Sequence, residues 1–208
     1  MRLVVPENLK EIQIHQYQKY KQIQDANPDS PEFCILKMVE ILCGLTQRQA
    51  LKIPTFELED TARILTESFL ADRKFKQRFT HNGVEYGFIP NLDKMAYGEY
   101  MDLSSYLNDD AEMHRFMAVA YRPIEDTMAD DLYSIQDYGG SDIYAEQMLS
   151  APVEYALEAR VFFWNLAKEL MSSMMDSLTQ EEMMRMEVLL LQNQALINAG
   201  AGIKQSIP

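Results

Sequence analysis

The sequence predicts a mainly α-helical fold, with one short antiparallel β-hairpin and a long C-terminal helical hairpin. Three observations lead to this fold class. Apolar residues recur at intervals of three and four along most of the 208 residues, as they do on the buried side of a surface helix. An Asn-Gly pair at 82–83 separates two short runs rich in aromatic and β-branched residues. Two long amphipathic runs follow Pro152.

A short strand is predicted at 2–5, and an amphipathic helix over 13–25. Ser30-Pro31 supplies an N-cap and a first-turn proline for a second helix. This helix is apolar on nearly all sides and runs to Gly44, a residue type favoured just after a helix end. We therefore expect the second helix to lie centrally in the fold.

Two further helices are expected before residue 72. Thr46 and Gln49 have the spacing of a capping box, which predicts a short helix that ends near Pro54. Apolar residues then recur with helical period from Leu58 to Phe69, and acidic residues fill the first turn, where the helix dipole favours anions.

The segment 76–89 predicts the hairpin. Both central residues of a tight type I′ turn need a positive φ, which Asn and Gly tolerate best. Asn82-Gly83 is therefore the expected turn, and helices at 97–107 and 109–121 follow, with Asp109 as the N-cap of the second. Residues 122–141 are acidic and close with Gly139-Gly140, which predicts a long loop.

The C-terminal part predicts two long helices. Pro152 opens the first, and Thr179 with Glu182 has capping-box spacing for the second. We expect this helical hairpin to pack through Phe163, Trp164 and Leu190. The chain is predicted to be a single domain over 1–208, with the acidic loop 122–141 as the expected place of any boundary, hinge or lid.

Charge restricts the classes of partner. The net charge is −13, of which residues 1–104 carry 13 basic against 15 acidic side chains and residues 105–208 carry 6 against 17. A surface this acidic disfavours nucleic acid and anionic membranes. Cys34 and Cys43 are too few for a disulfide framework, no stretch approaches the length of a membrane span, and the N-terminus has no signal-peptide pattern. We expect a protein of a reducing compartment.

Signatures of catalysis are absent, since no phosphate-binding loop, nucleophile elbow or zinc-protease motif occurs. Asp109, Asp110, Glu112 and His114 form either an acid–base cluster or a capped, acidic first helical turn. The other carboxylates that lie close in sequence are Asp93, Glu99 and Asp102. These either serve in hydrolysis, or act as turn, solvated or Lys94-paired groups. We expect no enzyme, no cofactor and no metal ion.

Two groups of residues are candidates for partner binding. The first is a basic cluster, for which an acidic protein surface is a more natural partner than nucleic acid; its members are Arg73, Lys74, Lys76 and Arg78. The second is a group of methionines, whose flexible thioethers suit adaptable apolar surfaces or simply fill a core. Its members are Met171, Met174, Met175, Met183, Met184 and Met186.

Several segments resemble a family of tailed-bacteriophage proteins. They are the VPE and QYQ runs at 5–7 and 16–18, EYGFIPNLD at 85–93, GEYMDL at 98–103, AVAYRPI at 118–124, and the stretch from Pro152 to Trp164. The resemblance spans most of the chain and carries no assigned site residue. It implies a structural or assembly protein of the phage tail or baseplate.

From this resemblance and the methionine-rich helices, we expect a non-enzymatic protein similar to a tail assembly chaperone. It would bind a tail or baseplate protein, or a second copy of itself, in the host bacterial cytoplasm during virion morphogenesis. The alternative is a permanent subunit of the tail, baseplate or neck, retained in the virion.

Overall fold

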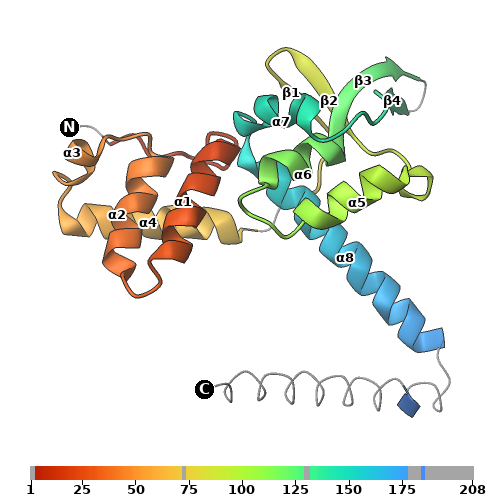
Figure 1. Ribbon diagram of the computed structural model, residues 1–208. Coiled ribbons are helices and arrows are strands. Elements are labelled where there is room, and N and C mark those ends of the chain that lie inside the picture. Colours follow the sequence, from red (N-terminus) through yellow and green to blue (C-terminus); the bar gives the residue numbers. More distant parts are fainter. Residues whose placement is uncertain (1–2, 72–73, 129–131, 178–183, 186–208) are drawn as a thin grey trace, which may run out of the picture. The chain divides into compact units, whose positions relative to one another are not determined.

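The fold is mainly helical and carries a four-stranded antiparallel sheet (Figure 1). The computed structural model describes residues 3–71, 74–128, 132–177 and 184–185, and the side chains of the 132–177 segment as far as residue 174. The chain divides into two compact units, Met1–Phe162 and Phe163–Pro208.

The four helices predicted in the first part of the chain are confirmed. They are α1 (Ile14–Ala26), α2 (Pro31–Leu42), α3 (Gln47–Ala50) and α4 (Thr55–Leu70). Pro31 occupies the first turn of α2, Gly44 follows it with φ +64°, and Val39 and Leu42 are buried as expected for a central helix. The strand predicted at 2–5 is wrong for the described residues 3–5.

The predicted hairpin is confirmed, but it is one part of a larger sheet. Strands β1 (Arg78–His81) and β2 (Val84–Phe88) meet at Asn82-Gly83, whose φ angles are +50° and +78°. Strands β3 (Tyr121–Thr127) and β4 (Tyr133–Ile135) extend the sheet in the order β1-β2-β3-β4, with Tyr86 opposite Pro123.

The loop predicted over 122–141 is therefore wrong at 122–127 and at 133–135, where β3 and β4 lie. Acidic residues favoured a loop, yet β3 is buried at Tyr121 and Arg122 and becomes exposed from Glu125 onward. Glu125 and Asp126, two of the acidic side chains that suggested a loop, occupy the exposed end of β3. Helix α7 (Asp142–Leu149), which lacks a strong apolar period, was not predicted.

The helix predicted over 97–107 is confirmed as α5 (Tyr97–Tyr106), which follows a 3₁₀ turn at Leu92–Lys94. The helix predicted over 109–121 is shorter, since α6 spans Met113–Ala120. Asp109 is not its N-cap: the Asp109 carboxylate instead accepts a hydrogen bond from the Ala111 N–H at 2.8 Å in the preceding turn.

Helix α6 forms the centre of the core of the first unit. Phe116, Met117 and Val119 are fully buried, and α6 packs on α5 and α7. Aromatic rings from the sheet and from the start of the last long helix, α8 (Val153–Ser177), pack against one another with centroids 4.3–5.3 Å apart. They include Phe79, Phe88, Tyr121, Tyr155 and Phe162.

Helix α8 (Val153–Ser177) begins directly after Pro152, as predicted. Backbone bonds fix its start to α1, because Ile14 N–H donates to Ala151 O at 2.9 Å and Val153 N–H donates to Ile12 O at 2.8 Å. The predicted packing through Trp164 is wrong, since Trp164 is 53% exposed while its neighbour Phe163 is 9% exposed. The second helix of the predicted hairpin, with Leu190, lies outside the described residues.

Among the described residues, no helix combines the length and apolar character that crossing a lipid bilayer requires.

Candidate functional site

The end of α8 carries the part of the predicted methionine group that the structure describes. Met171 is 64% exposed, Met174 is 67% exposed, and Leu170 beside them is 57% exposed. Met184 is also 59% exposed, whereas Met183, Met186 and the side chain of Met175 lie outside the described residues. Met171, Met174 and Met184, the members of this group whose exposure the structure gives, are therefore surface residues rather than core residues.

These apolar side chains share one side of the helix. At 100° per residue, Leu170, Met171 and Met174 fall within an arc of about 100°, and Asn165 and Ser172 lie on the opposite side. An arc of this kind is amphipathic and is typical of a helix that packs against another apolar element. We call Leu170, Met171 and Met174 the α8 surface.

The basic cluster is partly engaged inside the chain. Lys76 Nζ lies 3.0 Å from a carboxylate oxygen of Glu154 and 3.0 Å from one of Glu158, both on α8. Arg78 lies over the ring of Tyr133 at 4.5 Å. Lys74 is exposed, and Arg73 lies outside the described residues. The acidic second half of the chain thus supplies partners for Lys76.

Glu158 is a buried carboxylate in this network. It is 3% exposed, and burial raises its pKa while Lys76 opposes that rise. The backbone of Lys76 also belongs to this network, because its carbonyl accepts a hydrogen bond from the Tyr121 hydroxyl at 2.7 Å. These contacts connect the segment before β1, strand β3 and the start of α8.

The three candidate carboxylates at 93, 99 and 102 have separate partners. Glu99 is buried and forms an ion pair with Arg122 at 2.6 Å, not with Lys94. Asp102 accepts a hydrogen bond from the Tyr138 hydroxyl. The backbone N–H of Asp93 donates to the Asn91 side chain at 3.0 Å, so Asp93 lies in a capped turn.

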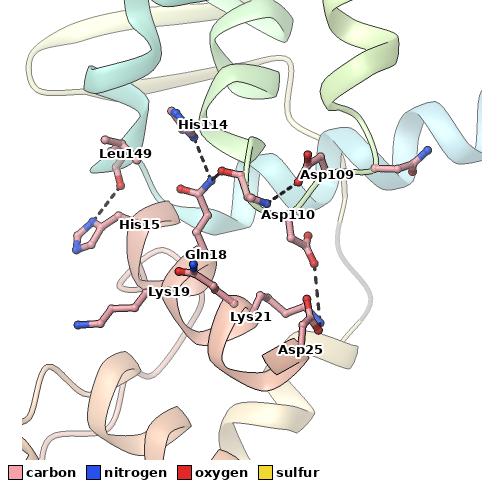
Figure 2. A pocket seen from close by; sticks show the side chains of 12 residues that line it. His15, Gln18, Lys19, Lys21, Asp25, Asp109, Asp110, His114 and Leu149 are labelled. Carbon is pink, nitrogen blue, oxygen red and sulfur yellow. Dashed lines mark hydrogen bonds and ion pairs between the residues drawn. The ribbon is translucent and has the colours of Figure 1, made fainter. Parts of the chain in front are cut away.

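A polar cavity of about 720 Å³ lies between α1, the turn 108–111, α6 and the end of α7 (Figure 2). Figure 2 shows His15, Gln18 and Lys21 of α1 on one wall, with Asp110 and His114 across from them. Three members of the acid–base cluster considered from the sequence, Asp109, Asp110 and His114, therefore line a single cavity, whereas Glu112 is not among its lining residues and lies 2.8 Å from Arg115. Sequence reasoning missed the contribution of α1, which is about 90 residues away along the chain.

Gln18 determines the protonation of His114. Its amide nitrogen donates to the Ala111 carbonyl at 2.5 Å and lies 3.0 Å from His114 Nδ1. Because that nitrogen is a donor, Nδ1 must accept, which makes His114 neutral with its proton on Nε2. Burial lowers the pKa of His114 and favours the same neutral form.

His15 has the opposite arrangement. Its Nδ1 lies 3.1 Å from the Leu149 carbonyl, an acceptor, so Nδ1 carries the proton and Nε2 presents a lone pair when the ring is neutral. The two histidines of the cavity thus have different tautomers, each set by its backbone or amide neighbour.

Asp110 anchors the floor of the cavity. Arg160 of α8 donates to the Asp110 carboxylate at 2.5 Å and to the Asp109 carbonyl at 2.7 Å, and Lys21 lies 3.9 Å from Asp110. Burial, with a further contribution from Asp110, raises the pKa of the nearby Tyr17 hydroxyl to about 12. In the part of the chain that the structure describes, no three His, Cys, Asp or Glu side chains are placed to share a metal ion.

The chain matches no family model, no curated protein and no solved structure.

Proposed function

We propose that this chain is a non-enzymatic assembly protein of the bacteriophage tail or baseplate. In this proposal it acts like a tail assembly chaperone and covers an apolar element of another phage structural protein during morphogenesis. The observation that carries the proposal is the exposed α8 surface of Leu170, Met171 and Met174. The resemblance of the segments at 85–93, 98–103 and 118–124 to tailed-phage proteins supports the same class.

The energetics of α8 support a binding role for this surface. A helix in water gains little stability from its backbone alone and depends on packing of its apolar side. From Ala167 to Met174 every described residue is exposed, yet the segment retains large apolar side chains. A partner helix that packs on the α8 surface would remove them from water, at about 25 cal/mol per Å² of apolar area.

Methionine suits a chaperone-like contact in particular. The unbranched thioether side chain adopts many rotamers and adapts to different apolar shapes. Two methionines beside a leucine thus favour a surface that binds its partner reversibly.

Mass spectrometry of purified phage particles tests this function. A chaperone-like protein is abundant in infected cells and absent from finished virions. Recovery of the chain from particles at a fixed copy number would instead support the alternative, a permanent subunit of the tail, baseplate or neck.

A further inference from the structure

Two neighbouring cavities lie in the first unit. The polar cavity beside α1 adjoins a second cavity of about 420 Å³, and both are lined by His114 and Leu149. The second cavity continues along α7 past Arg115, Asp142 and Glu146. We call the two cavities together the groove, which is bounded by α1, α6 and α7.

The groove is elongated rather than convergent. Its lining residues on α1 extend from His15 to Asp25, and these positions are separated by roughly 15 Å at the rise of an α-helix. An extended peptide advances roughly 3.3 Å per residue, so about five residues would cover this wall alone. Lining groups that are spread along a helix suit a chain-like ligand better than a small metabolite, whose groups converge on one centre.

Charge pairing within the groove is incomplete. Asp110 is paired with Arg160 and Lys21, and Asp142 is paired with Arg115. In the part of the chain that the structure describes, the carboxylate of Glu146 makes no hydrogen bond or ion pair. The carboxylate of Asp109 uses one oxygen to accept from the Ala111 N–H in its own turn. Two exposed carboxylates thus remain able to accept from a cationic ligand.

The groove also offers groups that suit a peptide backbone. Lys19 and Gln22 project from exposed positions on α1 and have no intrachain partner among the described residues. His15 Nε2 presents a lone pair because Nδ1 faces the Leu149 carbonyl. Along the α1 wall, His15 therefore offers an acceptor, and Lys19 and Gln22 offer donors.

We propose that this groove binds an extended peptide segment of a partner protein that carries arginine or lysine side chains. Glu146 and Asp109 accept from the basic side chains, while Lys19, Gln22 and the free nitrogen of His15 bind the peptide backbone. The net charge of −13 adds a long-range attraction for a basic segment and speeds its encounter with the groove.

Fluorescence anisotropy of the full chain with a labelled peptide tests the proposal. The probe is Gly-Ser-Arg-Gly-Ser-Arg-Gly-Ser, and its twin has both arginines replaced by glutamine. The test variant combines Asp109→Asn and Glu146→Gln; Asn retains the oxygen that caps the turn at Ala111. The control combines Glu125→Gln and Asp126→Asn, which removes the same charge from the exposed end of β3, outside the groove.

We expect the unmodified chain to bind the arginine peptide and the test variant to bind it about tenfold more weakly, the loss that two partly exposed charge contacts produce. The control variant should stay within twofold of the unmodified chain. Equal weakening by both variants would show general charge attraction and overturn the proposal. Absence of binding, or equal binding of the glutamine twin, would also overturn it. None of these outcomes bears on the α8 surface, so the proposed function is tested separately.

Discussion

Replacement of Glu99 by Gln should destabilise the protein strongly although the two side chains have nearly the same size. Glu99 is 4% exposed, and its carboxylate lies 2.6 Å from the guanidinium of Arg122, which is 6% exposed. Among the described residues, that guanidinium also lies over the ring of Tyr138 at 5.5 Å, and Arg122 Nε has no hydrogen-bond partner. Loss of the carboxylate charge therefore leaves a buried cation without its counterion.

The cost of breaking a buried ion pair on one side is about 3–5 kcal/mol. Because the Gln carbonyl still accepts one hydrogen bond from Arg122, we expect a loss near the lower end, about 3 kcal/mol. With a urea dependence of about 2–3 kcal/mol per molar, the midpoint of unfolding should fall by roughly 1 M or more.

Urea unfolding followed by circular dichroism measures this loss, and two further variants make it specific. Glu67→Gln breaks an exposed pair with Arg63 on α4 and should leave the midpoint unchanged. The double variant Glu99→Leu with Arg122→Met removes both charges and should recover most of the loss. An unchanged midpoint for Glu99→Gln, or a double variant no more stable than the single one, would refute the reasoning.

Two other predictions follow from the same structure. The pKa of His114 is lowered in the folded chain, chiefly by burial, while Glu112 and Asp142 oppose and Arg115 assists. The unfolded chain then binds the proton more readily, so the contribution of His114 to the free energy of unfolding is complete above about pH 6.5 and decreases as the pH falls below that value. The urea midpoints at pH 7.5 and 5.5 should therefore differ by less in His114→Gln than in the unmodified chain. An equal difference in both proteins would contradict the assignment. Gly87→Ala should cost about 1–3 kcal/mol by overpacking, because a Cβ there would lie 2.8 Å from Tyr133 Cδ2 and 3.0 Å from Ile124. Gly98→Ala, with open space around it, should leave thermal stability unchanged or raised, and equal losses at both glycines would contradict the packing at β2.

The local parts of the fold were readable from the sequence. Pro31 and Gly44 marked the ends of α2, and Asn82-Gly83 marked the hairpin, because each acts through backbone geometry within a few residues. Strand β3 was missed because its pairing with β2 is nonlocal, and β4 was missed with it because β4 pairs with β3. The acidic end of β3 resembles a loop in composition, and its partner strand β2 lies more than thirty residues earlier.

The candidate sites could be predicted only in part, because they too depend on contacts between residues far apart in the sequence. The methionines of α8 were identified from composition, but their exposure required coordinates. The pair Glu99–Arg122 joins residues 23 apart, and the cavity of His114 needs Gln18 of α1, 96 residues away. Sequence spacing predicts neighbours along one helix and does not predict which distant elements meet.

The claim that α8 binds another phage protein is tested most directly by quantitative co-purification from infected cells. The test variant is Leu170→Glu with Met171→Glu, which introduces charge on the α8 surface without a loss of helix propensity. The control is Asn165→Glu with Ser172→Glu, which adds the same charge to the opposite side of the helix. We predict that both variants fold as the unmodified chain does, and that the test variant alone loses at least tenfold of a phage tail or baseplate protein. Full retention of that protein by the test variant, or equal loss with the control, would contradict the claim.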